Sequence, residues 1–132
     1  VWWSKYHPFH SGLTGQSSLE LADAYEKVSG RQWSLPLGFR HALFEVVFDV
    51  LKRTQDVTKA ASIRDAIRAT NYKSIVGTID FNKGPFPNCA QTPLVMGQWA
   101  KGDKWPHELV LVDNALAPEI PTTGKPTLMK YS

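Results

Sequence analysis

Two histidines near the start of the chain have the spacing of a metal-binding pair. His7 and His10 form an H-x-x-H sequence. A zinc site needs a third or fourth ligand at a suitable spacing, and only His41, His107 and Cys89 remain to supply one. We therefore interpret the two histidines as part of a loop that follows a strand, and we expect neither a metal nor another cofactor.

Two carboxylates four residues apart are the other candidates for chemistry. Glu45 and Asp49 share one helical face, which is the geometry of a carboxylate pair. Asp49 also precedes Lys52 by three residues and Arg53 by four, which is typical of ion pairs on a solvated face and is the favoured interpretation. No G-x-S-x-G motif is present, and the glycines form no phosphate-binding loop. We expect no enzymatic activity.

Aromatic side chains crowd the first ten residues, where Trp2, Trp3, Tyr6 and Phe9 are found. Such a cluster most often belongs to a core. The alternative is a stacking wall for an apolar or planar ligand.

Composition indicates one folded domain. The chain has 132 residues, of which 42% are hydrophobic and 20% charged, and no apolar run approaches the roughly 20 residues of a membrane helix. The net charge is +3 and the 15 Lys and Arg residues are scattered, so we expect no nucleic-acid partner.

Cys89 is the only cysteine, which excludes an internal disulfide. The sequence starts at Val1 without a methionine or a signal peptide, so we expect either a removed export signal or a piece of a longer chain.

The first predicted helix runs from about Gly15 to Ser29. Thr14 or Ser17 can cap its start, Ser17 can form a capping box with Glu20, and Gly30 is a stop signal. The apolar spacing predicts a buried stripe of Leu21, Ala22, Tyr25 and Val28, with Glu20, Asp23, Glu26 and Lys27 in water.

The second predicted helix, Leu37 to Arg53 after Pro36, is apolar around most of its circumference. Its apolar residues are Leu37, Phe39, Ala42, Leu43, Phe44, Val46, Val47, Phe48, Val50 and Leu51. Its polar residues form one narrow line of His41, Glu45, Asp49 and Arg53. We expect such a helix to be buried on more than one face and covered by another polypeptide if not by this one.

A third helix is predicted from Thr58 to Ala69, with Ile63, Ala66 and Ile67 facing inward. The pattern also predicts strands over Val1–Tyr6 and Ser74–Phe81. Gly77 lies in the apolar face of the second strand, where it indicates a bulge or a close approach by another backbone.

A hairpin is predicted near the C-terminus, with strands Leu94–Trp99 and His107–Asp113 and a turn at residues 101–103. Residues 109–112 are apolar on both faces, as in a covered strand. The tail from Asn114 is expected to be extended, irregular and held only by packing.

Three motifs in this order resemble the C-terminal portion of branched-chain-amino-acid-type substrate-binding proteins, the type I periplasmic receptors of ABC importers. The family has G-Y/F-x-x-A, then I-R-D-A-L-x-x-T, then G-x-I-x-F-D with a following glycine. The matching residues are Gly38-Phe39 with Ala42, Ile63 to Thr70, and Gly77 to Phe81 with Gly84. The resemblance extends over nearly the whole chain, and the ordered set is more specific than any one motif.

The resemblance implies an α/β fold, part of a flytrap of two Rossmann-like lobes joined by three crossing strands. Residues of about 7–92 would supply helices and a strand of the first lobe, and about 93–132 a crossing strand, hairpin and tail of the second. The second helix would lie against a parallel sheet supplied by earlier sequence. Ligand would bind between the lobes, and closure would present them to an ABC permease in the membrane. The protein would be periplasmic, or extracellular and lipid-anchored.

The predicted ligand wall consists of Trp2, Trp3, Phe39 and His41, and the predicted ligand is a small amino-acid-like or aromatic or aliphatic carboxylate. Adjacent strand residues point in opposite directions, so one tryptophan should face the cleft and the other the core. The N-terminus of the second helix carries a partial positive charge that suits an anion. Two alternatives remain open: all four residues only pack, or the chain is a stand-alone interaction domain that dimerises through its apolar helix.

Overall fold

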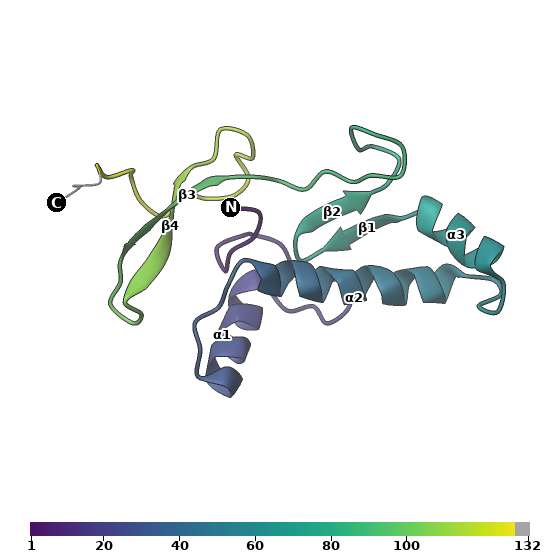
Figure 1. The fold of residues 1–132 in the computed structure, drawn as a ribbon, viewed down its shortest axis with the longest axis horizontal. Helices are drawn as coiled ribbons and strands as arrows, with labels where there is room; N and C mark the ends of the chain where they lie inside the picture. The colour runs from purple at the N-terminus through teal and green to yellow at the C-terminus, as the bar shows by residue number, and fades with distance from the viewer. Residues whose placement is uncertain (129–132) are drawn as a thin grey trace.

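The computed structural model describes residues 1–128 as a mixed α/β structure of three helices and two small antiparallel sheets (Figure 1). The helices are α1 (Ser18–Ser29), α2 (Pro36–Arg53) and α3 (Ala60–Arg68). One sheet pairs β1 (Asn71–Ser74) with β2 (Gly77–Asp80), and the other pairs β3 (Met96–Lys101) with β4 (His107–Asp113). The predicted three helices and C-terminal hairpin are therefore confirmed.

Helix α1 ends at its predicted stop and begins at Ser18, later than the predicted Gly15, because Ser17 rather than Thr14 is its N-cap. The Ser17 hydroxyl accepts the Glu20 N–H at 3.2 Å, and the Glu20 carboxylate accepts the Ser17 N–H at 2.8 Å. Gly30 ends the helix with φ of +64°. Two side-chain predictions were wrong, because Val28 is 89% exposed while Glu26 is buried. Glu26 is buried because the β3–β4 turn folds over it, and Lys104 and Trp105 both donate to its carboxylate.

On α2 the polar row faces the body of the chain and apolar side chains face solvent, the reverse of an ordinary surface helix. The predicted solvated ion-pair line was wrong for Glu45, which is 0% exposed, while Asp49 and His41 are half-buried. The residues that face solvent are apolar: Leu43, Phe44, Val47, Phe48 and Leu51. In Figure 1 the β1–β2 hairpin lies along one side of α2, whereas on the opposite side only α1 is drawn, at the N-terminal end of α2. Within residues 1–128, then, the chain leaves this face uncovered, and its burial by another polypeptide stays a prediction.

Helix α3 is shorter than predicted and shields only one side of α2. Ala66 is buried as predicted, but Ile67 is 42% exposed. Arg53 of α2 joins the two helices, since it donates to the Ala66 carbonyl at 2.9 Å and to the Thr70 hydroxyl at 3.0 Å.

The predicted single strand from Ser74 to Phe81 is in fact the turn and second strand of a hairpin. Ser74 pairs with Gly77 in the register, so Ile75 and Val76 form the turn. Both turn residues are fully buried, which explains why the sequence reads as one apolar strand. Gly77 has φ of +102°, a conformation that favours glycine. The neighbour that approaches it is the ring of Pro93 rather than another backbone, since a Cβ at Gly77 would lie 3.2 Å from the Pro93 Cδ.

Residues 1–6 do not form the predicted strand. The chain turns at Ser4, whose carbonyl accepts the His7 N–H at 3.1 Å. Only Val1 pairs in an extended way, because its amino group donates to the Val95 carbonyl at 2.7 Å and its carbonyl accepts the Val95 N–H at 3.1 Å. Trp3 then enters the core and packs edge-on against Trp33, with ring centroids 5.8 Å apart.

The β3–β4 hairpin has one covered face. Leu109 and Leu111 are buried, and Val110 and Val112 are half-buried. The tail is irregular as predicted, but packing alone does not hold it. The Leu111 carbonyl accepts the N–H groups of Thr123 and Gly124 at 2.8 and 3.2 Å, so the tail is bonded to β4.

Candidate functional site

The two neighbouring tryptophans differ in burial: one lies in the core and the other is exposed at the surface. Trp3 is 0% exposed and belongs to the core, whereas Trp2 is 46% exposed. One tryptophan therefore packs in the core as predicted, although residues 1–6 form no strand, and a cleft-facing role for the other stays a prediction. Trp3 cannot contact a surface ligand, so Trp2 alone remains a candidate.

His41 is also separated from Trp2. Its Nε2 lies 2.8 Å from the Ser11 hydroxyl, on the side of α2 that carries Glu45. Ser11 in turn accepts the N–H groups of Leu13 and Thr14, and it is buried. His41 thus fastens the loop before α1 to α2, and the structure does not place it with the other predicted ligand residues.

Trp2 and Phe39 do come together, in an open apolar hollow of about 540 Å³ at the N-terminal end of α2. Its lining residues are Trp2, Pro36, Phe39, Arg40 and Leu43. Pro36 occupies the first turn, Leu35 gives the helix no side-chain cap, and no acidic residue offsets the helix dipole there. The hollow can hold an apolar or aromatic group against Trp2 and Phe39, with the positive end of the helix nearby.

Sequence reasoning missed Arg40. Its guanidinium group is exposed and makes no ion pair or side-chain hydrogen bond within residues 1–128. The signal was present, because Arg40 is a cation inside a helix turn that is otherwise apolar. It was overlooked because the surrounding face was expected to be covered.

A second apolar hollow, of about 250 Å³, lies between α2 and the β1–β2 hairpin. Phe39 and Leu43 line it together with residues of the hairpin such as Val76 and Ile79. These two side chains therefore separate the two hollows, and both hollows border the outward face of α2.

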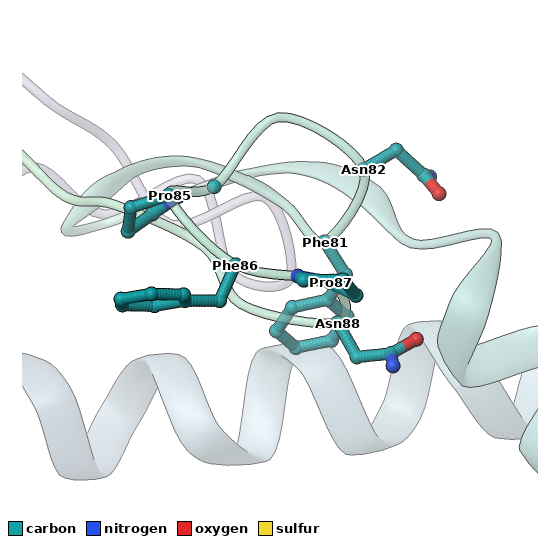
Figure 2. A pocket seen from close by; sticks show the side chains of 7 residues that line it. Phe81, Asn82, Pro85, Phe86, Pro87 and Asn88 are labelled. Atoms are coloured by element: carbon teal, nitrogen blue, oxygen red, sulfur yellow. The ribbon is translucent and has the colours of Figure 1, made fainter.

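The loop after β2 encloses a third hollow, of about 390 Å³. Figure 2 shows Phe81, Phe86 and Pro87 on the side of the loop that faces a helix, while Asn82 points away from it. The lining contains no titratable side chain: Phe81, Asn82, Gly84, Pro85, Phe86, Pro87 and Asn88. A hollow of this composition offers no acid, base or nucleophile.

The buried polar side chains that could do chemistry bind backbone groups instead. Glu45 accepts the N–H of Gly12 at 2.7 Å and the N–H of Ile75 at 3.0 Å. Ser4 lies 2.9 Å from the His7 Nδ1, the contact of a nucleophile with its base, but both side chains are buried. Burial, together with repulsion from the amino group of Val1, lowers the pKa of His7 to about 4. These contacts fix turns around α2.

Glu26 is the other buried carboxylate, and it joins α1 to the hairpin. It accepts from the Lys104 ammonium group at 2.5 Å, from the Trp105 indole at 3.0 Å and from the Trp33 N–H at 3.2 Å. Burial works to raise the pKa of Glu26, but the hydrogen bonds and the Lys104 charge outweigh it, so the net pKa lies below the usual value.

Two larger features are not found in the part of the chain that the structure describes. Within residues 1–128, no three His, Cys, Asp or Glu side chains lie together as metal ligands. No helix in that range is both long and apolar enough to cross a bilayer.

Comparisons with protein-family models, with curated proteins and with solved structures find no match for this chain.

Proposed function

We propose that this chain is the C-terminal portion of an extracellular solute-binding receptor of an ABC importer, with a flytrap fold whose remaining parts cover α2. The observation that carries the proposal is the uncovered apolar face of α2, formed by Leu43, Phe44, Val47, Phe48 and Leu51. An exposed apolar patch of this kind marks an interface. In the family that the ordered motifs resemble, this helix would lie against a parallel sheet, which would supply the missing cover.

The ligand in this proposal is a small amino-acid-like or aromatic or aliphatic carboxylate. Trp2 and Phe39 supply an apolar wall, and the uncapped start of α2 supplies the positive end of a helix dipole. His41 and Trp3 do not belong to this wall, because His41 is bonded to Ser11 and Trp3 is buried. Binding would close the lobes and present them to the permease, which is a shift between two conformations without chemistry.

The test uses the protein in the form that its own cells make, isolated with an antibody raised against this chain. We expect a chain with a mass above 14.8 kDa in the periplasmic or lipid-anchored fraction. Its melting temperature should rise on addition of a small carboxylate such as an amino acid or phenylacetate. A 14.8 kDa chain that no carboxylate stabilises would refute the proposal.

Two tryptophan variants examine the ligand wall in that same protein. Replacing Trp2 by Ala should weaken binding by ~1–3 kcal/mol, the range for loss of one apolar or stacking anchor. Trp99→Ala is the matched control, since Trp99 is similarly exposed but lies on β3. Equal effects of the two variants on affinity would mean that Trp2 does not contact the ligand.

The second candidate is a stand-alone interaction domain that dimerises through α2. The same uncovered face favours it, because burying Phe44 and Phe48 would stabilise any assembly that covers them. Sedimentation of the 132-residue chain distinguishes the two candidates: a stable dimer supports the interaction domain.

A further inference from the structure

Val1 is paired with the residue before β3 as if it were the end of a further strand of that sheet. Its amino group donates to the Val95 carbonyl at 2.7 Å, and its carbonyl accepts the Val95 N–H at 3.1 Å. Two residues that exchange both bonds in this way form an antiparallel pair. β3 begins at Met96, and the N-terminus lies beside its start (Figure 1). In antiparallel pairing, residues before Val1 would run along β3.

The contacts of β4 show which backbone groups of β3 point away from the hairpin. The Leu111 carbonyl accepts two N–H groups of the tail, at 2.8 and 3.2 Å, so it points away from β3. The His107 carbonyl also points away, because it accepts from the Gln32 side chain at 2.9 Å. Leu111 lies opposite Gly97, and in an antiparallel pair that exchanges no hydrogen bonds the N–H and C=O groups of both residues point outward. Gly97 therefore presents these groups to the outer edge of β3, and so does Trp99, two residues further along.

The bonds of Val95 indicate the same direction independently. Val95 is two residues before Gly97, and its N–H and C=O groups face Val1 at this edge. The register shifts between Met96 and Gly97, but the additional residue, Val112, belongs to β4, so β3 keeps its alternation. Within residues 1–128, no backbone hydrogen bond joins this edge of β3 to another segment.

The side chain of Val1 also lies where that of a neighbouring strand would lie. A methyl group at Gly97 would overlap the Val1 side chain and would lie 3.0 Å from the Cδ1 of Leu109. Val1 therefore packs over Gly97 beside the buried Leu109, which is the position of a diagonal neighbour in an antiparallel sheet. Both the backbone and the side chain of Val1 thus have the geometry of a third strand.

The position of Val1 decides what can occupy the edge. An unpaired strand edge is a template for one more strand. The place beside Met96 belongs to the residue that precedes Val1, so a strand from elsewhere would have to displace it. The tail is bonded to Leu111 at the other edge of the sheet and, through Thr127, to the side chain of Gln98. The segment directly before Val1 is therefore the occupant that fits.

We propose that the residues directly before Val1 form a third strand, antiparallel to β3, which pairs with the N–H and C=O groups of Gly97 and Trp99. The first residue before Val1 lies opposite Met96. The second lies opposite Gly97, and the fourth lies opposite Trp99. The inference rests on the proposed function in one respect, since it needs this chain to be the C-terminal portion of a longer protein.

Amide hydrogen exchange in the full-length protein tests whether the edge is paired. The N–H groups of Gln98 and Ala100 face β4, so they are references within the same strand. We expect the N–H groups of Gly97 and Trp99 to exchange as slowly as these references, within about tenfold. On an unpaired edge, they would exchange rapidly while the references stay protected.

A disulfide in the full-length protein tests the register. In a background without other cysteines, which includes Cys89→Ser, a cysteine replaces the first residue before Val1 and is combined with Met96→Cys. Residues of such a pair have Cα atoms about 4.5 Å apart, which a disulfide can bridge. We expect an internal crosslink, identified by mass spectrometry of the linked peptides. Ala100→Cys replaces Met96→Cys in the matched control and should form no crosslink, because it lies on the same face about 13 Å further along the strand.

The outcomes separate this inference from the receptor proposal. Rapid exchange at Gly97 and Trp99 would overturn the third strand, and so would a missing Met96 crosslink in a variant that circular dichroism shows to be folded. If carboxylates still raised the melting temperature of that protein, the receptor proposal would stand. A Met96 crosslink in a protein that no carboxylate stabilises would support the strand and refute the receptor. N-terminal sequencing that finds Val1 as the first residue of the cellular protein would overturn both.

Discussion

Glu45 of α2 and Ile75 of the β1–β2 turn are joined by a hydrogen bond of 3.0 Å from the Ile75 N–H to the Glu45 carboxylate. The two residues are 30 positions apart in the sequence. The other carboxylate oxygen accepts the N–H of Gly12 at 2.7 Å. One buried side chain thus fastens α2 to two loops, and this explains why its polar row faces inward.

Replacing Glu45 by Ala should be strongly destabilising. Two backbone N–H groups would lose their acceptor, and a buried donor without a partner costs about 1–3 kcal/mol. We expect a loss of about 3 kcal/mol or more in the free energy of unfolding, measured by urea denaturation. The exposed Glu119→Ala is the control and should change little. If Glu45→Ala were as stable as the control, Glu45 would not hold these loops in solution.

Replacing Gly38 by Ala should destabilise the chain although alanine favours helix. A methyl group at this position of α2 would overlap the indole ring of Trp3. Overpacking of this kind costs about 1–3 kcal/mol, which exceeds the gain of about 1 kcal/mol in helix propensity. Arg40→Ala on the same helix is the exposed comparison. Thermal unfolding decides the point, and a rise in melting temperature for Gly38→Ala would contradict the packing described.

The stability of the chain should fall as the pH is lowered from 6.5 to about 4 because of His7. The buried ring has its pKa lowered to about 4 from the ordinary 6.5, so the unfolded chain binds a proton more readily in this interval. Protons therefore favour unfolding there, by about 3 kcal/mol in total. Below pH 4 both states are protonated at His7, and its contribution is constant.

Two measurements check the histidine. Imidazole chemical shifts should show one of the four histidines titrating near pH 4. In denaturation at several pH values, His7→Asn should flatten the decline between pH 6.5 and 4, whereas the exposed His107→Asn should not. Titration of the His7 ring near pH 6.5 would rule out the buried neutral form.

Replacing Cys89 by Ser should change stability by less than about 0.5 kcal/mol, as at most exposed sites. The thiol is free and exposed, so it should react with a thiol reagent at the same rate in the folded and unfolded chain. A loss several times larger would mean that the loop after β2 is part of the core.

Local signals predicted the ends of α1, whereas long-range contacts decided which side of α2 faces inward. The capping box of Ser17 and Glu20 is visible in four consecutive residues. The acceptor role of Glu45 depends on Gly12 and Ile75, which are 33 and 30 residues away and contribute only backbone atoms. A hydrophobicity pattern cannot predict backbone partners for a carboxylate, so the sequence predicted that the polar row of α2 faces solvent.

The difference between local signals and long-range contacts also applies to the candidate site. Alternation along a strand predicted that Trp2 and Trp3 would point in opposite directions; their burial does differ, but residues 1–6 form no strand, so alternation is not the cause. The turn at Ser4 was not predicted, because it depends on the buried imidazole of His7, whose Nδ1 accepts the Ser4 N–H at 3.1 Å. Arg40 was missed for another reason: its importance appears only when the neighbouring phenylalanines are seen to be exposed.

The pairing of Val1 with Val95 has a consequence for the order in which the chain folds. Their two hydrogen bonds join residues 94 positions apart. Closing so long a loop is entropically costly until the intervening segments are already compact. The β1–β2 and β3–β4 hairpins, by contrast, need only neighbouring residues. During synthesis on a ribosome, Val1 cannot pair until Val95 has emerged, so this edge of the fold forms after the three helices and the β1–β2 hairpin have been made.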